Sequence, residues 1–136
     1  MRNRISYLVL LASVVLSLHL IGIFAGLYEN HIRIDVIQHI LAGVIFGTIW
    51  LWWLKPENIN ISKTLIFIST VSFVALGSVL WEVLEFATSS LLPSFASSFK
   101  FYSPTVGELL SDVASGLVGG VSVGMYAVLR KKVKFL

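Results

Sequence analysis

The chain has 136 residues, of which 57% are hydrophobic and only 12% are charged. Its mean hydropathy of +0.90 lies far above the usual balance of a soluble domain, so the composition indicates an integral membrane protein. The absence of cysteine excludes disulfides and thiolate metal sites. A formal charge of +3 would favour an acidic partner for a soluble protein, but here the basic residues follow membrane topology, and no nucleic-acid partner is expected.

Long apolar runs in the sequence predict an all-α integral membrane protein, a bundle of four transmembrane helices in a single domain over residues 1–136. The runs cover about residues 5–27, 34–54, 64–86 and 105–129. At ~1.5 Å per residue, each is long enough to cross a hydrocarbon core of ~30 Å. The first run exceeds the ~7–15 apolar residues of a cleaved signal peptide, so we expect it to be retained as a helix.

The lysines and arginines predict the orientation of the bundle. Eight of the ten fall at the two termini and in the link from Lys55 to Lys63, and only Arg33 and Lys100 fall on the opposite side. By the positive-inside rule, both termini are expected to be cytoplasmic, in a multi-pass protein of the cell membrane. Three tryptophans at positions 50, 52 and 53 are typical of the headgroup level at that end of the second helix.

Small residues recur at helical spacing and predict close packing between helices. They form three groups, namely Gly22 and Gly26, then Gly43 and Gly47, then Gly116, Gly120 and Gly124. Such spacing lets helix backbones approach each other in lipid, where the hydrophobic effect cannot hold helices together. We expect a compact bundle as the result.

The link between the third and fourth helices, residues 87–104, mixes serines and threonines with aromatic and aliphatic residues. This composition is typical of a segment that lies at the outer interface or folds back over the bundle. A plain connection and a functional lid are both open, and the plain connection is favoured for a link of this length.

Five of the seven acidic residues fall near the predicted outer ends of three helices. With one histidine they form three pairs, namely Asp35 and His39, Glu82 and Glu85, and Glu108 and Asp112. Spacings of three or four residues place each pair on one helix face. At ~1.5 Å per residue, His39, Glu82 and Asp112 each lie ~7–12 Å from a helix end, so we expect them to meet in one layer.

His19 in the first run is a weaker candidate for this cluster. It shares a stripe with Gly22 and Gly26 and is expected to turn toward the other helices. A single histidine in a membrane helix is more often a hydrogen-bonded packing residue than part of a site.

Five carboxylates cannot all remain ionised in a medium of low dielectric constant, because like charges repel and unpaired buried charges cost several kcal/mol. Pairing with Arg33, protons shared between acids, or a divalent cation would each compensate. Carboxylates with a histidine and no sulfur suit Zn, Mn, Fe or Mg. The sequence therefore predicts a divalent-metal site whose ligands come from His39, Glu82, Glu85, Glu108, Asp112 and Asp35.

Within this set, Glu85 and Asp35 are the catalytic candidates, with Glu85 as the general base. An ordinary interfacial role stays open for Asp35 and Glu108, and a negative charge at Glu108 suits the first turn of a helix. The spacings are not a zinc signature such as H-E-x-x-H, so the prediction depends on the convergence of all three pairs.

A family pattern emerges from these motifs: Asp35-x-x-x-His39 followed by Gly43, then Trp81-Glu82 with Glu85, then Glu108-x-x-x-Asp112 followed by Gly119-Gly120. The pattern resembles small bacterial inner-membrane proteins of the VanZ-like and YjdF-like type, over helices two to four. Such proteins often carry Asn four positions after the last Asp, where this chain has Gly116. The resemblance implies that Asp35, His39, Glu82 and Asp112 occupy the positions that carry the family pattern.

Three functions are open at this stage, and whether the protein is an enzyme is open with them. The leading one is a metal site that faces the outer leaflet and binds or acts on a lipid-linked or amphiphilic substrate among the membrane lipids. The second is translocation of protons or metal ions, although residues 9–18, 44–53, 65–76 and 118–129 in the inner halves of the helices carry no Asp, Glu, His, Lys or Arg. The third is a membrane subunit that recognises a cationic partner.

Overall fold

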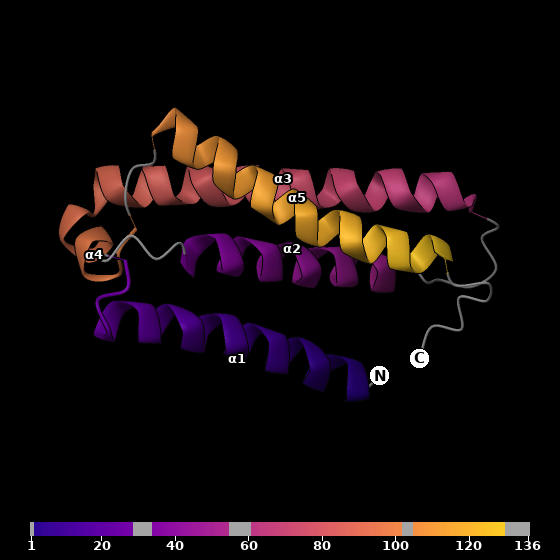
Figure 1. Ribbon diagram of the computed structural model, residues 1–136, viewed down its shortest axis with the longest axis horizontal. Coiled ribbons are helices and arrows are strands. Elements are labelled where there is room, and N and C mark those ends of the chain that lie inside the picture. The colour runs from indigo at the N-terminus through magenta and orange to yellow at the C-terminus, as the bar shows by residue number, and fades with distance from the viewer. Residues whose placement is uncertain (1, 29–33, 55–60, 102–104, 130–136) are drawn as a thin grey trace.

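The computed structural model describes residues 2–28, 34–54, 61–101 and 105–129, and within them every regular element is a helix (Figure 1). The elements in chain order are α1 (Arg2–Phe24), α2 (Ile34–Trp53), α3 (Lys63–Leu91), α4 (Pro93–Ser98) and α5 (Val106–Leu129). All but α4 are long and apolar enough to cross a membrane. The predicted fold class, an all-α bundle of four transmembrane helices, is therefore confirmed.

The four long helices run side by side, and α1 begins at the same end of the bundle at which α5 finishes (Figure 1). We name the opposite end, where α3 ends and α4 lies, the outer end. In the described ranges, α2, α3 and α5 pack against one another, whereas α1 packs against α2 and not against α3 or α5. The bundle is thus a three-helix core with α1 attached to one side.

α1 ends at Phe24, before the predicted end near residue 27, because residues 25–28 form a turn. Gly26 lies in that turn with φ +64°, a left-handed conformation that glycine adopts without steric cost. The prediction that Gly22 and Gly26 form a packing stripe on the first helix is therefore wrong. Gly22 is buried against the ring of Tyr28, within the same segment of chain.

α3 continues to Leu91, five residues beyond the predicted end at residue 86. The hydroxyl groups that suggested a loop bond back to the helix instead, since Thr88 Oγ1 donates to the Leu84 carbonyl at 2.7 Å and Ser89 Oγ to the Phe86 carbonyl at 2.9 Å. Pro93 then occupies the first turn of α4, where a proline needs no N–H partner.

The glycines of α2 and α5 allow the two helices to touch backbone to backbone. A side-chain carbon on Gly43 would overlap the carbonyl group of Gly116, and one on Gly119 would overlap the carbonyl group of Ile40. On the other side of α5, a carbon on Gly120 would lie 2.9 Å from the side chain of Val74 in α3. Close packing through the glycines of the second and fourth transmembrane helices is confirmed.

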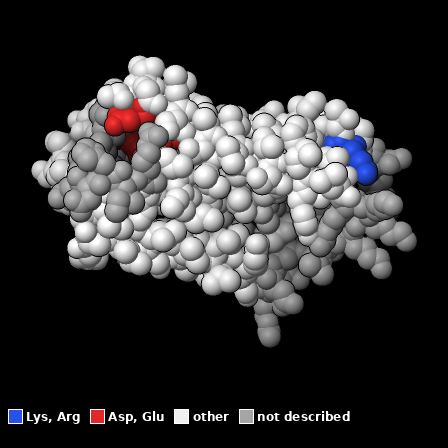
Figure 2. Space-filling model, viewed as in Figure 1, with Lys and Arg blue, Asp and Glu red and all other residues white. Residues whose placement is uncertain are grey.

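Two buried hydroxyl groups of the core, those of Thr70 and Ser115, are bonded within their own helices. Thr70 is fully buried, and its hydroxyl group donates to the Ile66 carbonyl at 2.7 Å. On the face shown in Figure 2, acidic groups lie at the outer end and a basic patch lies at the opposite end. This separation agrees with the charge distribution from which the orientation was predicted.

We expect Gly43→Ala to destabilise the protein by about 1–3 kcal/mol, because the added carbon would push α2 away from the backbone of α5. Gly77→Ala is the matched control, since its added carbon would lie 3.4 Å from the Phe46 ring, an ordinary contact. Thermal unfolding in detergent measures both. Equal stability of the two variants would contradict the close helix contact.

The predicted orientation is testable at the two ends of α3, because the chain contains no native cysteine. We expect Ser90→Cys to react with a membrane-impermeant maleimide on intact cells, and Lys63→Cys to react only after permeabilisation. Both positions are exposed in the structure. The reverse labelling pattern would place the termini outside.

Candidate functional site

Three helices of the core bring one potential ligand each to the outer end. His39 comes from α2, Glu82 from α3 and Asp112 from α5, and each offers one ligand atom within 4.8 Å of the other two. His39 Nε2 lies 4.0 Å from Asp112 Oδ2. The prediction that these three residues meet in one layer is confirmed, and we call them the triad.

Glu82 is the most deeply buried member of the triad, with 2% of its surface exposed. In the part of the chain that the structure describes, neither of its carboxylate oxygens has a hydrogen-bond partner. A buried carboxylate without a partner costs several kcal/mol if it is ionised. Glu82 therefore requires a proton or a cation beside it.

The triad fits a divalent cation in its chemistry and, with a small adjustment, in its geometry. One imidazole nitrogen and two carboxylates suit Zn, Mn, Fe or Mg rather than soft metals. Metal–ligand distances of ~2.0–2.2 Å place tetrahedral ligand atoms ~3.4 Å apart. The triad atoms, within 4.8 Å of one another, would have to close by about an ångström, which side-chain rotation supplies.

Glu85 and Asp35 lie beside the triad without belonging to it. Both line a neighbouring cavity, and Glu85 Oε1 accepts a hydrogen bond of 2.9 Å from Trp81 Nε1. Asp35 lies in the first turn of α2, where a negative charge is favourable. The metal-ligand and catalytic roles that the sequence suggested for these two carboxylates stay predictions.

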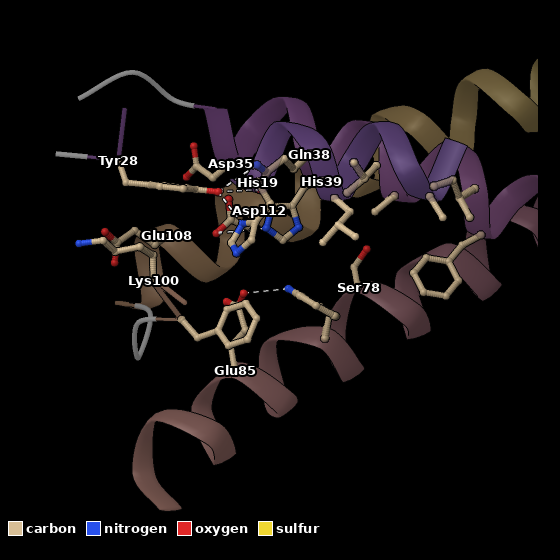
Figure 3. A pocket seen from close by; sticks show the side chains of 18 residues that line it. His19, Tyr28, Asp35, Gln38, His39, Ser78, Glu85, Lys100, Glu108 and Asp112 are labelled. Carbon is tan, nitrogen blue, oxygen red and sulfur yellow. Dashed lines mark hydrogen bonds and ion pairs between the residues drawn. The ribbon is translucent and has the colours of Figure 1, made fainter. Parts of the chain in front are cut away.

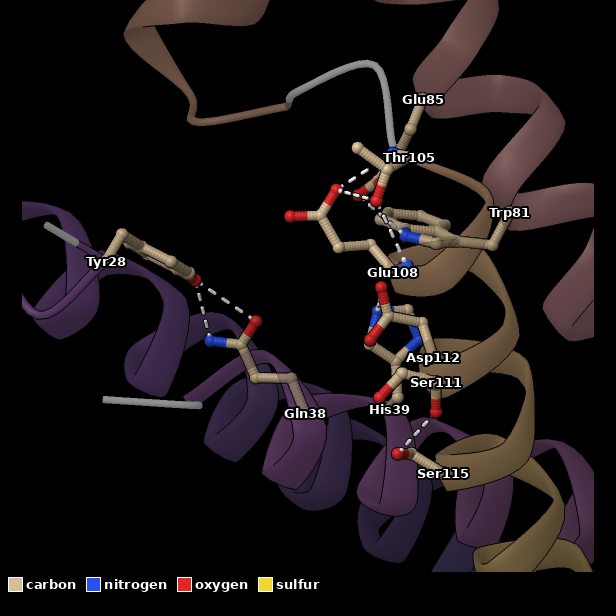
Figure 4. A network of polar contacts seen from close by, with 10 residues as sticks. All are labelled: Tyr28, Gln38, His39, Trp81, Glu85, Thr105, Glu108, Ser111, Asp112 and Ser115. Carbon is tan, nitrogen blue, oxygen red and sulfur yellow. Dashed lines mark hydrogen bonds and ion pairs between the residues drawn. The ribbon is translucent and has the colours of Figure 1, made fainter. Parts of the chain in front are cut away.

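Glu108 has a local structural role at the start of α5 (Figure 4). Its carboxylate accepts hydrogen bonds from the backbone N–H and the hydroxyl group of Thr105, at 2.8 and 2.7 Å. The Glu108 N–H in turn donates to Thr105 Oγ1 at 3.3 Å. This reciprocal pattern is a capping box, and it accounts for the exposed Glu108 without a metal.

A cavity of about 490 Å³ lies between α1 and the core at the outer end. The wall contains His39 and Asp112 of the triad, together with residues of α1, α2, α3 and α5 and the segment that follows α4. Figure 3 shows the labelled charged side chains of the cavity gathered toward one end. The cavity therefore adjoins the triad and shares two of its residues.

α1 is tied to the site through His19. The His19 Nε2–H donates to the Phe99 carbonyl at 3.1 Å, so in the neutral ring Nδ1 accepts from the Tyr28 hydroxyl at 2.7 Å. The Tyr28 oxygen accepts from Gln38 Nε2 at 2.9 Å (Figure 4). Burial raises the pKa of Tyr28, which keeps this hydroxyl group protonated. His19 is thus a hydrogen-bonded packing residue.

Residues 99–101, the segment after α4, fold back over the cavity. This is one of the two arrangements predicted for residues 87–104, the other being a position at the outer interface. Lys100 has φ 56°, an uncommon left-handed conformation for a residue with a side chain, and it lines the cavity. Phe101 stacks on His19 with ring centroids 5.7 Å apart and meets Trp81 edge to face at 6.1 Å. Arg33, the predicted charge partner of the acids, and the end of this segment at 102–104 lie outside the described residues.

The residues of the cavity wall that sequence reasoning missed include Tyr28, Gln38 and Lys100. Gln38 carried a signal, because a glutamine next to His39 in a membrane helix is costly unless it is bonded. Tyr28 and Lys100 carried none, since each reaches the cavity through a turn whose path is not visible in helical spacing.

Fold and site together define a multi-pass helical membrane protein with a buried cluster of carboxylates and a histidine at one end of its core. The chain belongs to the DUF2238 family of predicted membrane proteins, which matches residues 3–132. This match covers α1 as well as the three helices that suggested a family resemblance, and it does not show that the chain is VanZ-like or YjdF-like. Comparison with curated proteins and with solved structures found no match.

We expect Tyr28→Phe to lower the free energy of unfolding by about 1–3 kcal/mol, because it leaves His19 and Gln38 without their shared partner. Tyr7→Phe is the control and should change stability little, since it keeps the half-exposed ring that contacts Trp52. Chemical unfolding in detergent compares the two. A Tyr28→Phe protein as stable as wild type would mean that the hydroxyl group does not hold α1 in place.

Proposed function

We propose that this protein is a metal-dependent membrane protein in which the triad binds a divalent cation and the adjoining cavity binds a lipid-linked or amphiphilic substrate. The observation that carries the proposal is the pair of unpartnered Glu82 oxygens beside His39 and Asp112. A cation there would remove the cost of burying two carboxylates close together. Three helices converging on one buried point is also the way in which helix bundles build metal sites.

The residues around the triad divide into a holding set and a reacting set. His39, Glu82 and Asp112 would hold the cation, which as a Lewis acid would polarise a phosphoryl or carbonyl oxygen of the substrate. Glu85 lines the cavity and is oriented by Trp81, so it is placed to accept a proton from a water molecule. Asp35 faces the same cavity from α2 and would bind or orient the substrate.

The proposed relationship to VanZ-like or YjdF-like proteins supports the same site. Four residues carry that sequence pattern, and three of them, His39, Glu82 and Asp112, are the triad. The fourth, Asp35, lines the cavity next to them. A pattern spread over three helices that converges on one place is what a shared chemical site would require.

Ion translocation is the weaker alternative. Below the triad, the core is filled by fully buried Val74 and by backbone contacts such as that of Gly43 with Gly116. Thr70 is the fully buried polar residue at this depth, and its hydroxyl group donates a hydrogen bond within its own helix. No observation on the described residues favours a path to the inner end.

The proposal is tested by elemental analysis of detergent-purified protein beside a Glu82→Gln, Asp112→Asn double variant. We expect about one equivalent of Zn, Mn, Fe or Mg in the wild type and none in the variant. Relative to protein stripped with a chelator, metal at a hundredfold excess over its Kd should stabilise the wild type by about 2.7 kcal/mol.

Glu57→Gln is the control, because it removes one carboxylate charge in the link between the second and third helices. It should leave metal content and stability unchanged. Metal-free wild type that is also indifferent to added metal would defeat the proposal and leave a protonated Glu82 as the explanation of the site. Metal retained in the double variant would place the ion elsewhere.

A further inference from the structure

We propose that the occupant of the cavity is a zwitterionic phospholipid whose headgroup carries a primary ammonium group, bound with one acyl chain in the inner part of the cavity. This inference rests on the proposed function, since it names the substrate class of the same site. It is carried by three features of the cavity: its length, its open side and its charge.

The cavity is polar at its outer end and apolar further in. Along α2, Asp35, Gln38 and His39 come first and are followed by Ala42, Ile45 and Phe46. The apolar side chains on the facing surface of α1 are Ala12, Val15 and Leu16, and they lie inward of His19. From Asp35 to Phe46 the wall is about 16 Å long at ~1.5 Å per residue. Of that length, the polar positions up to His39 would take the headgroup, and the apolar positions from Ala42 to Phe46 span about 6 Å, enough for the first carbons of one acyl chain.

We place the entrance of the cavity between α1 and α3, on a side where the bilayer would lie. α1 forms one wall and α3 contributes Ser78, Trp81 and Glu85, yet α1 and α3 do not pack against each other in the described ranges. The two walls are joined at the outer end through His19 and the segment after α4. A lipid can therefore enter sideways from its own leaflet without leaving the membrane.

The charge of the cavity favours a cationic group on the ligand. Among the described residues, four carboxylates line it, from Asp35, Glu85, Glu108 and Asp112, against one lysine, Lys100. A divalent cation in the triad would offset Glu82 and Asp112, which leaves an excess of negative charge at the mouth. An ammonium group would donate hydrogen bonds to Asp35 and Glu85, while the phosphate of the same headgroup would lie toward the metal and Lys100.

Native mass spectrometry of the full chain tests this inference. The protein is presented with equal amounts of phosphatidylethanolamine and phosphatidylglycerol that carry the same acyl chains. We expect the ethanolamine lipid to be retained about tenfold over the glycerol lipid. The Asp35→Asn, Glu85→Gln double variant should reduce that ratio about tenfold, whereas Glu57→Gln should leave it unchanged.

A second variant tests the acyl-chain position independently. Ala42→Phe fills the inner part of the cavity and should lower the retention of both lipids together, with their ratio unchanged. Equal retention of the two lipids by the wild type, a preference for phosphatidylglycerol, or a ratio unaffected by the Asp35 and Glu85 substitutions would each overturn the inference. Undiminished lipid retention by Ala42→Phe would do the same.

Metal analysis of the same samples separates the two proposals. The Asp35→Asn, Glu85→Gln protein should keep its metal, because neither residue belongs to the triad. A wild type that holds metal but has no lipid preference would contradict the lipid inference alone. A wild type without metal that still prefers phosphatidylethanolamine would sink the metal proposal alone, since the cavity is then more negative still.

Discussion

The backbone contact between Gly43 of α2 and Gly116 of α5 sets the geometry on which the site depends. His39 lies one helical turn before Gly43, and Asp112 lies one turn before Gly116. When the two glycines meet, the side chains one turn outward are brought to the same depth on facing surfaces. The 4.0 Å separation of His39 Nε2 and Asp112 Oδ2 is therefore a consequence of helix register, and a larger residue at either glycine would move both ligands.

α3 joins this arrangement through the same four-residue period. Its buried positions are Thr70, Val74, Ser78 and Glu82, and those of α5 include Asp112, Gly116, Gly120 and Gly124. Val74 packs on Gly120 and Ser78 on Gly116, so Glu82 comes next in line with Asp112. Rows of residues four apart are the ridges that pack into grooves when helices cross obliquely, as α5 crosses α3 in Figure 1. The triad is the outer end of the core, with ionisable groups in place of small residues.

The sequence predicted the four helices and the meeting of the triad because both follow from helical spacing. Apolar length identified four spans, and the period of four identified glycine faces and acid pairs that share a helix side. Spacing alone does not distinguish Glu82, which faces two other helices, from Glu108, whose carboxylate bonds to Thr105. It also missed the continuation of α3 through Thr88, where hydroxyl groups sustain the helix they were expected to end. Contacts made by turns, such as Tyr28 with Gln38, have no periodic signature.

The two sides of the cavity differ in how firmly they are built. α2, α3 and α5 interlock through glycines whose contacts cannot be loosened one at a time, because any shift disturbs the whole row. α1 and its turn are held at the outer end by the hydrogen bonds of His19 to the Phe99 carbonyl and of Gln38 to Tyr28, each worth about 1 kcal/mol. The proposed site for a membrane amphiphile would require both properties, since the triad would have to stay fixed while one wall yields to admit the chain. The weaker attachment of α1 is therefore where access to the site is decided.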